Sequence, residues 1–267
     1  MQLPDANRLS VLASTILLAY AVSPYIDLPA TELTLGLPGA IFSFRFDVST
    51  LASLLVALLA GVGTDWLLYT HPSGRTTRTF PHWLLPALTA WVIGVTLGTL
   101  DVSLQWWAVF GFGGILLILV FLAEYIVVDL SDVRHVPATV GLTAISFALF
   151  LILAIAVRAA GLRLYLLLPA LVIPFGLVSL RTLYLRLGGR WCYAWAFAIA
   201  AIVGQIAIGL HYWPFKPLSY GLILLGPAYA LTSAAGSIEE GRSWRSLWIE
   251  PVAMWALMWA LAWMSGR

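Results

Sequence analysis

Residues 105–128 read QWWAVFGFGGILLILVFLAEYIVV and hold a single charged side chain, Glu124. An α-helix needs about 20 mostly apolar residues to cross the ~30 Å hydrocarbon core of a bilayer. The stretch therefore predicts a membrane-spanning helix. Dividing the rest of the chain at charged residues, Pro and Gly gives eight further ranges of this kind: 9–26, 48–69, 82–100, 138–160, 163–186, 190–211, 217–236 and 247–264.

The composition supports the same fold class over the whole chain. Of the 267 residues, 61% are hydrophobic and 10% are charged, whereas soluble domains have about 45–50% apolar and about 25% charged residues. Disorder and a disulfide scaffold are excluded by this hydrophobicity and by the single cysteine, Cys192. We expect an all-α, polytopic integral membrane helix bundle in one transmembrane domain, residues 1–267. It would have about nine transmembrane helices, or eight if 217–236 does not cross.

Two segments near the N-terminus have a more specific interpretation. The longest loop, 27–47, mixes Pro and Gly with Ile41 and several Phe residues, a combination that favours an interfacial segment lying on the bilayer. The apolar run after Arg8 is compatible with a cleaved signal peptide. Because Asp5 lies in its charged region and Pro24 lies at the expected cleavage site, a retained first span is the favoured interpretation.

Orientation follows from the distribution of Lys and Arg between the loops. If the N-terminus is inside and the C-terminus is outside, eight Lys and Arg residues lie on the inner face and five on the outer face. This excess of positive charge inside favours that topology. We therefore expect a multi-pass protein of a prokaryotic cytoplasmic (inner) membrane. A net charge of +2 with no polybasic block argues against a nucleic-acid partner. The inner set is Arg8, Arg75, Arg78, Arg134, Arg186, Arg190, Arg242 and Arg245, and the outer set is Arg45, Arg158, Arg163, Lys216 and Arg267.

Two segments of the chain resemble each other. Residues 84–100 (LLPALTAWVIGVTLGTL) and 167–183 (LLPALVIPFGLVSLRTL) are identical at nine of 17 positions. They fall in the third and sixth predicted spans, which run in opposite directions. This parity is typical of the inverted three-span repeats of transporters, although Leu-rich and Ala-rich helices also match by chance.

A few ionisable residues lie within the predicted spans, where they are costly and commonly mark a site or a pair. Asp65, Glu124 and Arg181 each lie about one turn from the inner end of a span, and Glu250 has a similar depth. The inner loops add Asp129, Asp132, Arg134, His135, Glu239, Glu240 and Arg242.

Three interpretations of this cluster remain open. Glu124 or Asp65 could pair with Arg181 as a structural contact between helices. The same carboxylates could carry a proton or an ion in a transporter. Alternatively, Glu124, Asp129 and Asp132 could hold Mg²⁺ against a lipid phosphate in an enzyme at the inner membrane face. The four histidines lack a metal-binding spacing, and no nucleophile or phosphate-loop motif is present. The sequence therefore predicts no metal site and leaves the cofactor unknown.

Proline, glycine and tryptophan residues within the apolar spans predict where helices bend, pack closely or present an aromatic face. Pro169, Pro174 and Pro227 lie within spans and predict kinks, and the Gly94–Gly98 pair predicts close helix packing inside the bundle. Trp244, Trp248, Trp255, Trp259 and Trp263 share one stripe of the last span. Such a stripe offers a face to lipid, a flat ligand or a partner.

The leading functional hypothesis is non-catalytic. We expect a hydrophobic scaffold or accessory subunit that holds lipid, a pigment-like ligand or the helices of a partner membrane subunit. The alternatives are a secondary transporter and a lipid-phosphate enzyme.

Overall fold

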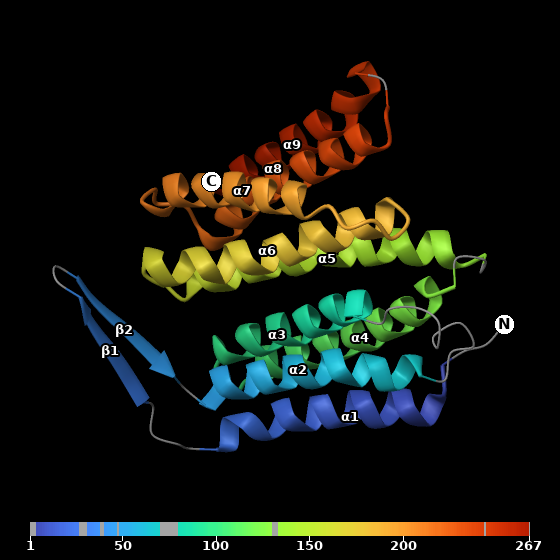
Figure 1. The fold of residues 1–267 in the computed structure, drawn as a ribbon. Coiled ribbons are helices and arrows are strands. Elements are labelled where there is room, and N and C mark those ends of the chain that lie inside the picture. Colours follow the sequence, from blue (N-terminus) through green and yellow to red (C-terminus); the bar gives the residue numbers. More distant parts are fainter. Residues whose placement is uncertain are drawn as a thin grey trace. The chain divides into compact units, whose positions relative to one another are not determined.

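The computed structural model describes residues 4–26, 31–37, 40–46, 48–69, 80–129, 133–242 and 244–266. Within these ranges the chain is mainly helical (Figure 1), and each predicted span coincides with one helix to within about one turn. The helices are α1 (Ala6–Val22), α2 (Val48–Leu68), α3 (Leu84–Gly98), α4 (Leu104–Val127), α5 (His135–Ala159), α6 (Leu164–Arg186), α7 (Tyr193–His211), α8 (Pro217–Glu239) and α9 (Trp244–Gly266). Short 3₁₀ turns are η1 (Ser23–Tyr25) and η2 (Phe80–Trp83).

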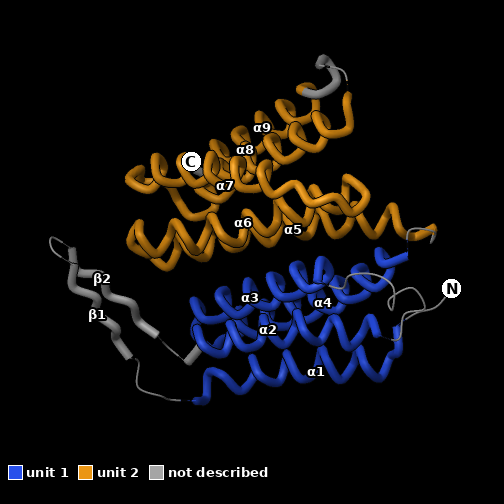
Figure 2. The backbone as a smooth tube through the Cα atoms, viewed as in Figure 1, with its two compact units in different colours: residues 1–129 blue, residues 130–267 orange. Residues whose placement is uncertain are grey.

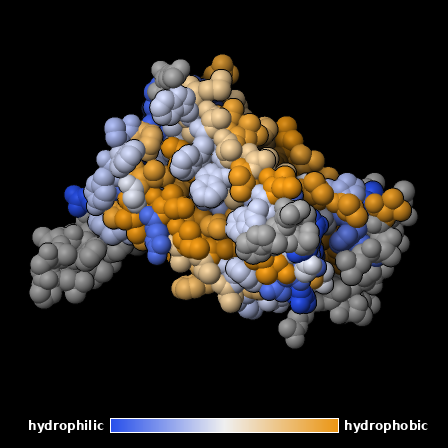
Figure 3. All heavy atoms as spheres, turned by 90° about the horizontal axis from the view of Figure 1, so that it is seen from above, coloured by the Kyte–Doolittle hydropathy of each residue, from blue (hydrophilic) through white to orange (hydrophobic). Residues whose placement is uncertain are grey.

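These helices confirm a membrane helical bundle. Eight of them, α1 to α8, are long and apolar enough to cross a bilayer. The helix α9 has 23 residues, so it also has the length of a span, and its crossing stays a prediction. Hydrophobic side chains are spread over much of the visible surface in Figure 3, whereas strongly hydrophilic ones occur in a few places. A soluble protein rarely has large continuous apolar patches on its surface.

One segment departs from the all-helical expectation. Strand β1 (Thr31–Leu37) pairs antiparallel with β2 (Ala40–Phe46) in a hairpin. The sequence is consistent with a hairpin, because Pro38 and Gly39 separate the two strands along the chain and this dipeptide is a turn signal. That the loop 27–47 lies at the bilayer interface stays a prediction.

The chain divides into two compact units (Figure 2), residues 1–129 and 130–267. In unit 1, α2 packs on α3 and α1, while α4 packs on α3 and α1. Its core includes Ile16, Leu67, Leu117 and Phe121, which are fully buried. Gly94 of α3 lies where α1 and α2 approach, because a Cβ there would be 2.5 Å from Cβ of Ser53. Gly94 therefore packs inside the bundle, as predicted.

In unit 2, α8 is the central helix. It contacts α5, α6, α7 and α9, and small residues fill much of its buried surface, among them Gly221, Gly226, Ser233 and Ala234. Small residues allow the backbones of membrane helices to approach closely. By contrast, α9 packs mainly along α8. Pro169 and Pro174 lie within α6, and Pro227 lies within α8, each inside a continuous helix.

Candidate functional site

An arginine clamp joins the ends of α6 and α8. The Nε of Arg186 donates to Oε1 of Glu240 at 2.5 Å, and its Nη2 donates to Oε2 of Glu240 and to Oγ of Ser237. Its Nη1 donates to the carbonyl of Ser233 at 3.0 Å. This guanidinium lies close to α8, since a Cβ at Gly236 would be 2.9 Å from its Nε and Nη1. Its hydrogen bonds use all three nitrogens, and the positive charge lies at the negative end of the α8 dipole.

The turn after α8 positions the other charged groups beside this clamp. The backbone N–H of Arg242 donates to the carbonyl of Ser237, and that of Gly241 donates to the carbonyl of Ile238. This is the Schellman pattern, which needs the positive φ of 68° that Gly241 adopts. Arg242, half exposed, then reaches Oε2 of Glu240 with its Nε at 2.7 Å. Hydrogen bonding from Arg186 is the main reason that the pKa of Glu240 is held below its ordinary value.

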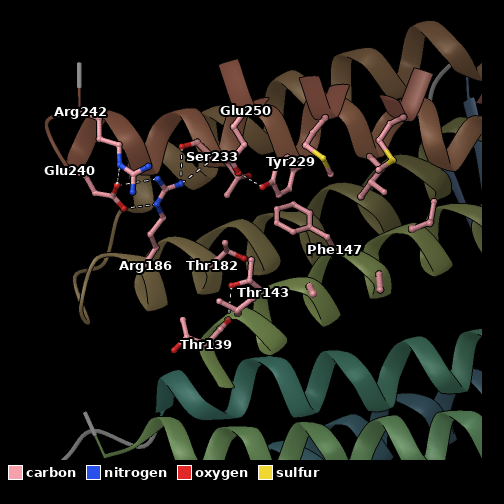
Figure 4. Close-up of a pocket in the computed structure, with 18 residues that line it drawn as sticks. Thr139, Thr143, Phe147, Thr182, Arg186, Tyr229, Ser233, Glu240, Arg242 and Glu250 are labelled. Atoms are coloured by element: carbon pink, nitrogen blue, oxygen red, sulfur yellow. Dashed lines mark hydrogen bonds and ion pairs between the residues drawn. The ribbon is translucent and has the colours of Figure 1, made fainter. Parts of the chain in front are cut away.

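A groove of about 730 Å³ opens beside these charges between α5, α6, α8 and α9. Figure 4 shows its charged end at Arg186, Glu240 and Arg242, with Phe147 farther along the groove. This volume falls within the range typical of ligand pockets, about 300–1,000 Å³. Apolar side chains line most of its length: Val140, Phe147, Leu151, Leu225, Met254 and Met258.

A second polar group lies deeper in the groove. The hydroxyl of Tyr229 on α8 donates to Oε1 of Glu250 on α9 at 2.5 Å, and the two side chains point toward each other in Figure 4. The ring of Tyr229 packs edge-on against Phe147, with 5.2 Å between the ring centroids. Glu250 thus faces the groove with Oε1 engaged by the phenol.

Threonine hydroxyls line the wall formed by α5 and α6. Thr182 is 6% exposed, and its hydroxyl has no hydrogen-bond partner among the residues described. The hydroxyl of Thr139 is buried and, within the same ranges, is also unpartnered, whereas Thr143 donates to the Thr139 carbonyl. A buried hydroxyl without a partner costs free energy. These groups are therefore suited to receive a polar atom of a ligand.

Unit 1 contains a buried pair that the sequence interpretation missed. Oε2 of Glu124 lies 2.7 Å from Nδ1 of His82, and their side chains are 0% and 8% exposed. His82 belongs to η2, directly before α3, while Glu124 lies near the end of α4. The imidazole compensates part of the cost of burying this carboxylate.

The remaining predicted residues have different surroundings. Asp65 is half-buried near the end of α2, and Arg181 is 1% exposed in α6, 5.4 Å from the ring of Tyr184. Because Arg181 is in unit 2, its pairing with Glu124 or Asp65 stays a prediction. Glu239 accepts from Nε1 of Trp195 on α7.

The acidic site proposed for an enzyme also stays a prediction. Asp129, at the end of unit 1, is half-buried, as are Arg134 and His135 in unit 2, whereas Asp132 lies outside the described residues. In the ranges that the structure describes, no group of three His, Cys, Asp or Glu side chains could hold a metal ion.

The tryptophan stripe lies on an exposed face of α9. Trp248, Trp255, Trp259 and Trp263 are all exposed, and the side chain of Trp244 lies outside the part described. Trp255 and Trp259 pack edge-on at 5.9 Å. Trp255 also lies against Gly226 of α8, where a Cβ would come within 2.7 Å of its ring. The stripe as a face for a ligand or a partner stays a prediction.

Several groove residues were not predicted as site residues: Thr139, Thr143, Thr182, Arg186 and Tyr229. A signal for the wall was present, because Thr139, Thr143, Phe147 and Leu151 recur every four residues and so share one face of α5. For Arg186 and Tyr229 the partners lie about 20 to 50 residues away along the chain. Local spacing therefore could not reveal them.

Comparisons with known proteins bear on the family. No curated protein and no solved structure matches the chain. One family model, described as protein of unknown function (DUF5656), matches residues 28–265. The match covers α2 to α9 and therefore the complete groove as well as the Glu124–His82 pair. The chain belongs to the DUF5656 family of proteins of unknown function.

Proposed function

We propose that this protein is a non-catalytic, multi-pass component of a prokaryotic cytoplasmic membrane that holds a lipid in the groove of unit 2. The observation that carries this proposal is the polarity of the groove along its length. Charged groups lie at the ends of α6 and α8, and mainly apolar side chains line the rest, with Glu250 and several hydroxyls among them. A lipid has the same order of groups, with a charged head followed by an apolar tail.

The length of the groove supports a lipid tail as the ligand. Its lining on α5 runs from Thr139 to Leu151, so at 1.5 Å per residue it is about 18 Å long. One leaflet is about half of the ~30 Å hydrocarbon core, or about 15 Å. The groove is therefore long enough for a tail that crosses one leaflet.

The orientation expected from the loop charges assigns the groove to a leaflet. Arg186 and Arg242 belong to the set of basic residues that the positive-inside rule puts on the cytoplasmic side. In this orientation the charged end of the groove is at the cytoplasmic interface and its apolar part lies in the inner leaflet. A lipid of that leaflet could enter sideways, since Ala144 and Ala148 in the groove wall are exposed.

The test fills the groove and measures bound lipid. The full chain is purified in a mild detergent, and its lipids are quantified by native mass spectrometry and by extraction. Ala148→Trp puts an indole into the groove and should remove most of the bound lipid. Ala198→Trp, at an exposed position of α7 that does not line the groove, should retain it. Equal lipid in both variants, or none in the unsubstituted protein, would overturn the proposal.

A second candidate function is proton-coupled transport, favoured by the buried Glu124–His82 pair. A carboxylate and an imidazole in contact at membrane depth are typical of proton relays. Transport predicts proton uptake by vesicles that contain the protein, and loss of that uptake in Glu124→Gln. A protein that moves no protons in this assay is not such a transporter.

A further inference from the structure

We propose that the groove selects a phospholipid with one acyl chain and a free glycerol hydroxyl, a lysophospholipid. This inference rests on the proposed function and specifies its ligand. Three polar features of the groove carry it: a cation at the mouth, a carboxylate with unused acceptor capacity, and a buried hydroxyl without a partner among the residues described. Each matches a different group of the lipid.

The cation at the mouth is Arg242. Arg186 and Arg242 share one acidic neighbour, Glu240, so the three groups together carry one positive charge. Arg186 uses every nitrogen in contacts to α8 and to Glu240, whereas Arg242 contacts Glu240, among the residues described, through its Nε. The terminal nitrogens of Arg242, which is exposed, therefore have hydrogen-bond capacity for an anion. A guanidinium binds a phosphate well because its planar donors match the phosphate oxygens.

The carboxylate is that of Glu250. Tyr229 donates to Oε1, and an ionised carboxylate has further lone pairs on Oε2 that only accept. A diacyl phospholipid has only ester oxygens at its glycerol carbons, and these are acceptors too. An ester oxygen placed against Glu250 would put two hydrogen-bond acceptors face to face with no donor between them, which disfavours binding of the diacyl phospholipid. A lysophospholipid has a hydroxyl there, which donates.

The buried hydroxyl is that of Thr182, across the groove from Glu250 (Figure 4). It lies four residues before Arg186 on α6, about 6 Å deeper along the helix axis. Its unpartnered Oγ1 can donate to the single ester carbonyl of a lysophospholipid. The groove therefore has a place for one phosphate at its mouth and, on facing walls, for one hydroxyl and one ester, followed by an apolar channel for one tail.

The experiment compares two lipids, one with a free glycerol hydroxyl and one in which that hydroxyl carries a second acyl chain. The full chain in detergent micelles is titrated with monoacylglycerol phosphate and, separately, with diacylglycerol phosphate, and the bound fraction is read by native mass spectrometry. The unsubstituted protein should bind the monoacyl lipid at least about tenfold more tightly, since a hydrogen bond to a charged group is at stake. Inorganic phosphate at the same concentration should displace neither lipid, which would show that the headgroup is not bound as a free ion.

Two variants separate the parts of the site. Glu250→Gln keeps an acceptor for Tyr229 but adds an N–H₂ group that can donate a hydrogen bond to an ester oxygen. The preference for the monoacyl lipid over the diacyl lipid should therefore fall to within about twofold. Arg242→Gln should weaken the binding of both lipids by a similar factor and leave the preference for the monoacyl lipid unchanged. Glu239→Gln is the matched control, because Glu239 contacts Trp195 on α7 and does not line the groove, and it should bind like the unsubstituted protein.

The outcomes distinguish this inference from the proposed function. If the protein binds both lipids equally and Ala148→Trp abolishes both, the groove holds lipid but the selection for a free hydroxyl is wrong. If the preference persists in Glu250→Gln, the carboxylate is not its source and the inference is again wrong. If neither lipid binds, the proposed function itself is wrong.

Discussion

The close approach of three helices at Gly94 makes the stability of unit 1 sensitive to a single methyl group. In Gly94→Ala the new Cβ would lie 2.5 Å from Cβ of Ser53 and 2.9 Å from Cε1 of Tyr20. Both neighbours are fixed, because Ser53 and Tyr20 are each 2% exposed. The Tyr20 hydroxyl also donates to the carbonyl of Ala90 at 2.5 Å. The substitution therefore has no free space to occupy.

The expected loss of stability follows from these contacts. Overpacking a close-packed interior costs about 1–3 kcal/mol, and displacement of the Tyr20 ring adds about 1 kcal/mol for its hydrogen bond. Replacing glycine by alanine within a helix raises the stability by about 0.5–1 kcal/mol, which offsets part of this loss. We therefore expect Gly94→Ala to lower the free energy of unfolding by about 2 kcal/mol.

The assay is equilibrium unfolding in detergent, followed by circular dichroism. Gly111→Ala on α4 is the control, because a Cβ there meets nothing within 4 Å, and it should leave stability unchanged or slightly raise it. Adding Ser53→Gly to Gly94→Ala removes the closest contact, so the loss in the double variant should be smaller than the sum of the single losses by at least about 0.5 kcal/mol. A Gly94→Ala protein as stable as Gly111→Ala would refute the packing argument.

Two further predictions concern charged groups. Arg186 holds the pKa of Glu240 below its ordinary value of 4.5, so their ion pair stabilises the fold above that pH and is lost as the pH falls through the lowered pKa. Glu240→Gln should therefore lower the free energy of unfolding at pH 7 by about 1 kcal/mol, which a lower melting temperature would show. The difference in melting temperature between the variant and the unsubstituted protein should vanish in acid; a difference that stays constant with pH would contradict this account. His82→Phe removes the imidazole from the buried Glu124 and should cost about 1–3 kcal/mol, whereas His135→Phe, at a half-buried position, should cost less in the same melting assay.

The helices of this protein could be predicted from its sequence because a bilayer requires long apolar runs. The weakest of these predictions, 217–236, became the most central helix of unit 2, α8. Pro227 and the many small residues made it the least certain span, since they interrupt an apolar pattern. The same small residues allow four neighbours to pack closely against it. A low apolar signal in a membrane chain therefore indicates either a non-spanning segment or a helix in the centre of the bundle.

The candidate site could be predicted only in part. The sequence indicated a concentration of charge at one end of the spans, and Glu240, Arg242 and Glu250 do line the groove. It did not indicate Arg186 or Tyr229 as their partners, because the pairs form between helices whose relative rotation depends on packing. It suggested Arg181 as a partner of Glu124 or Asp65, which stays a prediction, and it did not indicate the contact of Glu124 with His82. The depth of a residue along a span can be read from the sequence of one helix. The direction in which its side chain points, and hence its partner, depends on how the neighbouring helices pack.

The use of hydrogen-bonding capacity separates structural charges from groups suited to a ligand. Burying an ionised group in a membrane is tolerated when its donors or acceptors are engaged. By this criterion Arg186 is structural, since all three of its nitrogens are engaged. Arg242 and Glu250 each have one described contact and face the groove, where the Thr182 hydroxyl has none among the residues described. Three groups with unused hydrogen-bonding capacity thus face one groove, which supports the proposed binding of a polar headgroup there.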